Sequence, residues 1–121
     1  MSIPTLTELT SKKCVPCEGG VPPLEPDVVD ALIRTVPGWT LDEDGKRIHR
    51  GWTARNFVAG LHFLDKVGEL AEEEGHHPDL HLEGYRNVAI EITTHAIGGL
   101  SENDFILAAK INAIPIEVKR S

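Results

Sequence analysis

The chain lacks a long apolar run, a basic stripe and a leader pattern, and each absence narrows its class. No hydrophobic segment approaches the roughly 20 residues that a membrane span needs, and residues 1–5 carry neither a basic nor a hydrophobic leader region. Lys and Arg number 12 against 19 Asp and Glu, a net charge of -7, which leaves no basic footprint for nucleic acid. We therefore expect a soluble, cytoplasmic protein with no membrane or nucleic-acid partner, acting on a small molecule or another protein.

Cysteine is also scarce. The chain has two, Cys14 and Cys17, in a C-x-x-C pair that can serve as half of a zinc site, a redox dithiol or a disulfide. A zinc site needs a second pair of ligands at suitable spacing, and no such pair lies nearby. A thioredoxin-like site needs a surrounding βαβ pattern, which is missing too. We expect a structural or incidental role for both cysteines, with metal binding or redox use as the alternatives.

The chain is long enough for one domain. Its 121 residues are 40% hydrophobic, which supports a single core with little stability to spare, so we expect help from oligomerisation. Residues 1–26 are expected to form an irregular arm, because prolines and glycines break every periodic pattern there. Residues 27–121 are expected to form the domain, starting with a short helix that Asp27 caps and Pro37 ends.

The segment from Ala54 to Glu74 has the strongest helical pattern. Its apolar side chains cover nearly half of the helix circumference, whereas contact with one sheet uses a stripe of about 100°. The excess predicts either a deeply embedded helix or an apolar surface shared between subunits, with Phe63 and Leu70 at the shared surface. Gly75 is expected to end the helix in the left-handed conformation.

Two hairpins flank this helix. Residues 39–41 and 48–52 surround a turn at 42–45, and a strand near 79–82 precedes an alternating run at 88–95. A capping box at 101–104 then introduces a closing helix over residues 105–114. The resulting order, α-β-β-α-β-β-α, predicts an α+β fold in which a four-stranded antiparallel sheet carries a helical layer on one face.

Three histidines are the most informative residues of the chain: His76, His77 and His95. Because Gly75 turns the chain and Pro78 restricts its predecessor to an extended conformation, the directions of the first two imidazoles are fixed. Glu72 lies four residues before His76 and is expected to orient that ring. His95 is expected to end the last strand, where antiparallel pairing brings it close to the other two.

Imidazole changes charge near neutral pH and can both take and give a proton in one turnover. The three histidines therefore predict acid/base chemistry, such as removing a proton from one atom and protonating a hydroxide that leaves another. The remaining histidines, His49, His62 and His81, are expected to lie at the surface.

In these patterns the chain resembles the pterin-4a-carbinolamine dehydratases. The resemblance spans residues 37–114 and rests on E-x-x-x-H-H-P at 72–78, T-H at 94–95 and G-L-S-x-x-D at 99–104. It implies a four-stranded antiparallel sheet with three helices on one face, assembled as dimers or tetramers. It also implies a hydro-lyase without metal or cofactor, which dehydrates 4a-hydroxytetrahydropterin to quinonoid dihydropterin and water and so supports tetrahydropterin recycling.

The resemblance also implies roles for single residues. His76 and His95 would be the acid/base pair, with the direction of each proton transfer left open, and His77 would complete the catalytic set while binding the pterin with Thr94. Three further residues would support them. Glu72 would tune His76, and Pro78 would shape the pocket wall. Asp104 would either orient His95 or cap the last helix.

Two further functions remain open. Vertebrate members of the family also act as dimerisation cofactors of a transcription regulator, so the chain could be a protein-interaction module. The three histidines could instead bind a metal ion together with Cys14 or Cys17, although adjacent histidines rarely point the same way in an extended chain.

Overall fold

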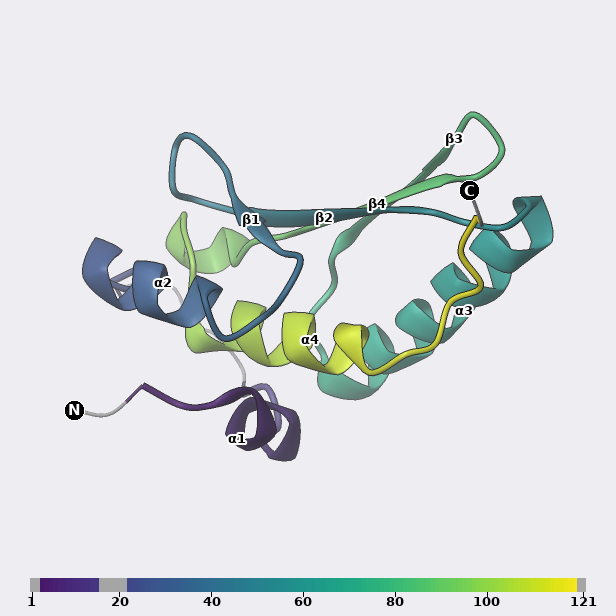
Figure 1. Cartoon of the computed structure of the whole chain (residues 1–121). Coiled ribbons are helices and arrows are strands. Elements are labelled where there is room, and N and C mark those ends of the chain that lie inside the picture. Colours follow the sequence, from purple (N-terminus) through teal and green to yellow (C-terminus); the bar gives the residue numbers. More distant parts are fainter. Residues whose placement is uncertain (1–2, 16–21, 120–121) are drawn as a thin grey trace.

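The computed structural model describes residues 3–15 and 22–119. Four antiparallel strands form one sheet in the order β1-β2-β4-β3, and helices cover one of its faces (Figure 1). The strands are β1 Thr40–Leu41, β2 Ile48–Thr53, β3 Asp79–Glu83 and β4 Asn87–Ile92. The helices are α1 Leu6–Ser11, α2 Pro26–Ile33, α3 Phe57–Glu74 and α4 Glu102–Asn112, and a short 3-10 helix, η1, spans His95–Ile97.

The predicted α+β class is confirmed, with α2, α3 and α4 on the same side of the sheet (Figure 1). The central strand β4 pairs with β2 from Ile48↔Ile92 to Thr53↔Asn87 and with β3 from Asp79↔Glu91 to Glu83↔Asn87. Alternation along β4 then points every second residue at the helices, and these side chains are at most 2% exposed: Val88, Ile90 and Ile92.

Phe63 belongs to the core, and its expected place at a subunit surface is wrong. The side chain is 1% exposed, and its ring centroid lies 4.9 Å from that of Trp52 on β2. The wide apolar arc of α3 is therefore divided between two environments. One part faces the sheet, while the N-terminal turns leave Phe57 48% and Leu61 44% exposed.

Both ends of α3 follow from local sequence. The Asn56 side chain accepts the Ala59 N–H at 2.8 Å and so caps the first turn. At the other end Gly75 has φ 66°, and the His76 N–H donates to the Ala71 carbonyl at 3.2 Å, as in a Schellman motif. This left-handed glycine, expected from the sequence, sends the chain directly into the histidine pair.

The arm contains a helix where we expected irregular chain. Thr5 and Glu8 form a capping box at the start of α1, a T-x-x-E signal that the surrounding prolines obscured. Leu9 is completely buried, and α1 packs on α4 on the side away from the sheet (Figure 1). The following helix begins one residue before the expected cap Asp27, because Pro26 occupies its first turn.

The segment after β4 also differs from expectation. The strand ends at Ile92, and His95 begins η1 instead of ending the strand. Backbone pairing between Thr94 and Gly99, with the Thr94 N–H donating to the Gly99 carbonyl at 3.0 Å, closes this segment into a compact loop. Within the described ranges, no helix combines the length and the apolar character that crossing a membrane requires.

Candidate active site

A cavity of about 250 Å³ lies where four segments meet: the arm, the end of α3, the loop after β4 and the start of α4. Its lining contains all three histidines singled out in the sequence, together with Thr94, and we call it the histidine cavity. The remaining lining residues are Val15, Gly75, Thr93, Ala96 and Asn103. The arm lies about 60 residues before His76 in the chain, and the loop after β4 lies about 20 residues after it. Both nevertheless meet His76 and His77 in this one small site.

His76 is held by a buried carboxylate on α4. Its Nε2 atom lies 2.6 Å from Oδ1 of Asp104, whose side chain is 0% exposed, and the imidazole itself is 12% exposed. An ionised carboxylate only accepts hydrogen bonds, so this contact places a proton on Nε2. In neutral His76 the lone pair then resides on Nδ1, the nitrogen left to exchange a proton with a ligand.

The second oxygen of Asp104 is fixed as firmly as the first. Oδ2 accepts the Thr94 hydroxyl and the Ser101 N–H, each at 2.8 Å. Since the Thr94 proton is used there, the contact of 2.8 Å between the Thr94 and Ser101 hydroxyls has Ser101 as its donor. Both carboxylate oxygens are thus satisfied in the interior, which a buried charge requires.

Asp104 therefore has two roles at once. It forms the capping box of α4 with Ser101, as the sequence predicted, and it binds His76. Its alternative expected role, orienting His95, is not what the structure shows. The reason is that His95 lies on η1, outside the strand, while the Schellman turn brings His76 over the first turn of α4.

Glu72 contacts a different histidine from the one expected. Its Oε2 lies 2.9 Å from Nε2 of His77, and both side chains are well exposed. The i, i+4 argument for His76 assumed a continuing helix, whereas Gly75 ends the helix and turns His76 inward. Pro78 follows at the start of β3, half-buried and outside the cavity lining.

Val15 and Asn103 are among the lining residues that the sequence reasoning missed. The backbone of Val15 is bound at both ends by the Asn103 side chain, with the Val15 N–H donating to Oδ1 at 3.0 Å and Nδ2 donating to the Val15 carbonyl at 2.6 Å. The two residues are 88 positions apart. The only sequence signal was proximity, since Val15 lies inside the C-x-x-C pair and Asn103 precedes Asp104.

The arm is also anchored next to Val15. The Cys14 N–H donates to Oε1 of Glu74 at 2.8 Å, and Lys110 on α4 donates to Oε2 at 2.8 Å. Burial raises the pKa of Glu74, but the bonds from Cys14 and Lys110 outweigh it and leave this pKa below its ordinary value. Burial raises the pKa of the Cys14 thiol to about 12, with a further rise from Glu74, so this thiol stays protonated. Cys17 lies outside the described residues.

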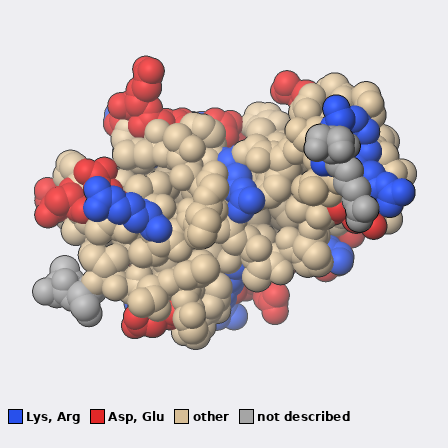
Figure 2. Space-filling model, in the orientation of Figure 1, with Lys and Arg blue, Asp and Glu red and all other residues tan. Residues whose placement is uncertain are grey.

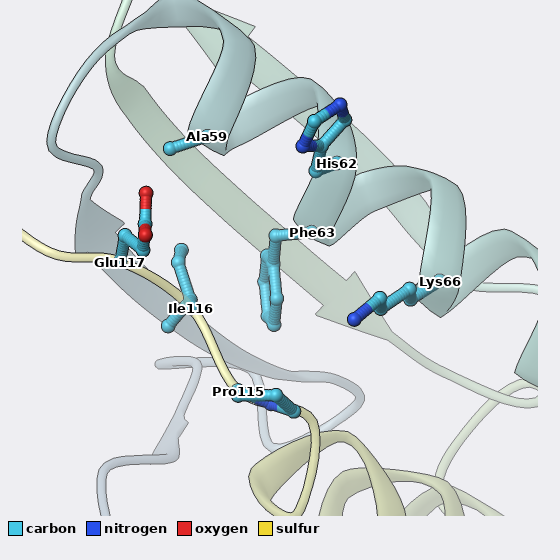
Figure 3. A pocket seen from close by; sticks show the side chains of 7 residues that line it. All are labelled: Ala59, His62, Phe63, Lys66, Pro115, Ile116 and Glu117. Atoms are coloured by element: carbon cyan, nitrogen blue, oxygen red, sulfur yellow. The ribbon is translucent and has the colours of Figure 1, made fainter.

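Another cavity, of about 370 Å³, lies between α3 and the C-terminal segment (Figure 3). His62 and Lys66 border it with Glu117, around an apolar floor that includes Phe63. Its lining includes one histidine, His62, whereas the histidine cavity has three. His62 is exposed, as expected.

The basic side chains that Figure 2 shows do not form a continuous surface, as expected from the composition. On the face shown in Figure 2, Lys and Arg side chains lie in separate groups and not in one continuous stripe. Among the residues that the structure describes, no three His, Cys, Asp or Glu side chains are grouped so that they could hold a metal ion. The histidine cavity holds three imidazoles, one of them oriented by a buried carboxylate.

Comparison with known proteins agrees with this site. The family model for pterin 4 alpha carbinolamine dehydratase matches residues 22–114, which include the whole sheet and the three histidines. The chain belongs to this family. Its members are named as dehydratases, a class of hydro-lyase, as the resemblance in sequence implied.

Individual relatives of this chain show how far the similarity extends. The mitochondrial pterin-4-alpha-carbinolamine dehydratase 2 of Arabidopsis thaliana is 51% identical over 116 residues, which cover 93% of this chain but 62% of that protein. A relative from Halorhodospira halophila is 49% identical and is covered over 96% of its length. A solved structure of a transcriptional coactivator/pterin dehydratase from Brucella melitensis superposes with a TM-score of 0.71 at 27% identity, over 76% of this chain and 97% of that one.

Proposed function

We propose that this chain is a hydro-lyase that dehydrates 4a-hydroxytetrahydropterin to quinonoid dihydropterin and water, and so supports tetrahydropterin recycling. The observation that carries the proposal is the cavity that brings together His76, His77 and His95, with His76 bound to buried Asp104. Membership of the dehydratase family supplies the substrate class.

The reaction needs two proton transfers that balance. A base takes the proton from N5 of the pterin, the C4a–oxygen bond breaks, and an acid protonates the departing hydroxide to give water while a C4a–N5 double bond forms. The reaction consumes no net proton: one histidine gains the proton that the other loses, and proton exchange with solvent restores the starting state of both.

We assign these transfers to His76 and His95. Asp104 fixes the Nε2–H tautomer of His76 and leaves Nδ1 as the acceptor, which suits a residue that takes a proton there. His95, exposed on η1 at the cavity edge, then serves as the acid that protonates the leaving hydroxide. A solvent-facing position also lets the released water depart.

The remaining residues of the site bind the pterin or shape the cavity. His77, oriented by Glu72, contacts the pterin from the exposed side of the cavity. Thr94 is 3% exposed and donates its hydroxyl proton to Asp104. We therefore propose that it positions this carboxylate and also lines the substrate site. Pro78 keeps His77 extended and leads the chain into β3.

We also propose that the enzyme is a homo-oligomer and that it acts in the cytoplasm; the Arabidopsis relative carries a mitochondrial name. Three apolar side chains at the start of α3 support self-association, because they are between 44% and 53% exposed and adjacent on the helix: Phe57, Val58 and Leu61. These residues replace Phe63 as the ones to test at an interface.

The alternative is a protein-interaction module. The Brucella melitensis structure is described as a transcriptional coactivator as well as a pterin dehydratase, and the same exposed apolar turns of α3 offer a surface for a helical partner. Absence of dehydratase activity in the intact protein would move this alternative to first place.

The test is stopped-flow absorbance decay of freshly generated 4a-hydroxytetrahydropterin, after exhaustive dialysis against a chelator. Wild type should accelerate the decay, and His76→Ala and His95→Ala should each lower kcat by about two orders of magnitude or more. His49→Ala, which alters an exposed histidine on β2, is the matched control and should behave as wild type. A wild-type rate equal to that of buffer would contradict the proposal, and full loss on chelation would implicate a metal.

A further inference from the structure

The arm is fastened to the histidine cavity by a clamp on the backbone of Val15. The two hydrogen bonds between Val15 and the Asn103 amide, of 3.0 and 2.6 Å, use one donor and one acceptor on each partner. Asn103 is 4% exposed, so its amide is removed from water to make these bonds. Loss of these two bonds would leave the buried amide with fewer partners and would lower the free energy of unfolding.

The residue before Val15 reinforces the clamp. The Cys14 N–H is bound by Glu74, and its Sγ lies 3.6 Å from the Asn103 carbonyl. Cys14 is 8% exposed while Val15 is 66% exposed, although the two are adjacent. Hydrogen bonds thus hold the backbone of the arm at Cys14 and Val15, while the Val15 side chain stays exposed at the cavity.

The backbone of Val15 is held by two hydrogen bonds, yet its side chain is exposed and adds no burial to the fold. The lining of the cavity gives it a use. Val15 faces the same 250 Å³ space as His76, His77 and His95, and most of the other lining groups are polar. Ligand sites commonly pair a few polar groups that orient the ligand with apolar groups that contact its flat faces.

We propose that Val15 is a substrate-contact residue, the apolar wall against which the planar ring system of the pterin packs, and that Asn103 is the residue that positions it. The inference rests on the proposed function for the identity of the ligand. Asn103 and Asp104 are neighbours on the first turn of α4, so this turn positions both the acid/base histidine and the opposing wall.

The first test replaces the wall. Val15→Ser keeps the backbone clamp and removes the exposed apolar side chain, so KM should rise about five- to tenfold while kcat stays within about twofold of wild type. Val118→Ser is the matched control, since Val118 is 49% exposed and lies beside Ala54 at the other end of α3. It should leave KM unchanged. An unchanged KM for Val15→Ser would overturn the proposal.

The second test releases the clamp. In a Cys17→Ser parent, the thiol of Cys14 should react slowly with a thiol reagent, because it is buried and protonated. Asn103→Ala in the same parent should raise the labelling rate of Cys14 by about tenfold or more, and it should raise KM as Val15→Ser does. Val15→Ser should leave the labelling rate as in the parent. Faster labelling with an unchanged KM would show that the arm is only structural and would reject the wall.

A binding measurement separates this inference from the proposed function. The Kd of 7,8-dihydrobiopterin, a stable pterin, is measured by fluorescence for wild type, Val15→Ser and Val118→Ser. An inactive wild type whose Kd rises in Val15→Ser alone would keep the wall and reject the dehydratase. An active wild type with equal Kd and KM in all three proteins would keep the dehydratase and reject the wall. A wild type that neither binds nor reacts would reject both.

Discussion

Nε2 of His76 and Oδ1 of Asp104 are 2.6 Å apart, and the carboxylate is completely buried. The pair joins the end of α3 to the start of α4, so the orientation of the proposed base depends on the packing of two helices. A carboxylate in this position does not touch the substrate. It acts through the imidazole, by fixing its tautomer and its orientation.

Asp104→Asn should therefore impair catalysis more than binding. The amide oxygen can keep the bonds from Thr94 and Ser101, but the amide nitrogen then faces Nε2 of His76 and reverses the tautomer. We expect kcat to fall by about 10²-fold with KM within about threefold, measured by stopped-flow decay of the substrate.

Glu102→Gln is the control for this change. Glu102 lies two residues earlier on the same helix, and its carboxylate forms an exposed ion pair with Lys12 at 2.6 Å. It should leave kcat unchanged. Equal losses in both variants would mean that charge near the helix start matters and the contact with His76 does not.

Thr94→Val should destabilise the fold because it keeps the side-chain shape and removes the hydroxyl that Asp104 accepts. Oδ2 of Asp104 then keeps only the Ser101 N–H as a donor, and this loss should lower the free energy of unfolding by about 1–3 kcal/mol in urea titrations. Thr53→Val on β2, at an exposed position, should change it by less than about 0.5 kcal/mol. A Thr94→Val protein as stable as wild type would show that water replaces the hydroxyl.

Glu74 should make stability depend on acidity. Its pKa is lowered in the folded protein from the ordinary 4.5 by the bonds from Cys14 and Lys110, which outweigh the opposing effect of burial. The stabilisation is therefore fully present above pH 4.5 and is lost as the pH falls through the lower folded value. Glu74→Gln should flatten this decline when unfolding is followed from pH 6 down to about pH 3.

Glu73→Gln serves as the comparison for Glu74, since Glu73 precedes it on α3 with an exposed side chain. Its acid unfolding curve should match that of wild type. If both variants decline as steeply as wild type, other carboxylates dominate the acid transition.

Leu61→Glu should dissociate the proposed oligomer. The side chain is 44% exposed in the single chain, so a charge there does not enter the core but would be costly within an interface. Light scattering after size exclusion should report a smaller mass than for wild type. Glu73→Lys, on the polar side of α3, should keep the wild-type mass, and an unchanged mass for Leu61→Glu would place any interface elsewhere.

The elements of this fold could be predicted because their signals are local. Gly75 ends α3 as expected, the alternation at 88–92 gives β4, and the capping box at Ser101 gives α4. The partners of the site could not be predicted in the same way. Glu72 was matched to His76 by helical spacing, and this fails because one left-handed residue changes which histidine points inward.

Contacts between distant segments were beyond local reasoning altogether. Nothing near Val15 indicates that Asn103 binds it, because the contact exists only after α4 has packed between the arm and the sheet. The helix α1 was missed for a related reason. Its capping box at Thr5 was readable, but its six residues are stable only through Leu9, which is buried against α4.

The double use of Asp104 limits how this protein can be engineered for heat resistance. A designer who improves helix caps would normally treat the capping residues of α4 as free positions, yet any exchange of Asp104 also alters the contact with the proposed base. The start of α2 carries no such constraint, because its N-cap residue, Glu25, forms no side-chain capping bond. Glu25→Ser or Glu25→Asp offers about 1 kcal/mol at a helix end whose side chains do not line the histidine cavity.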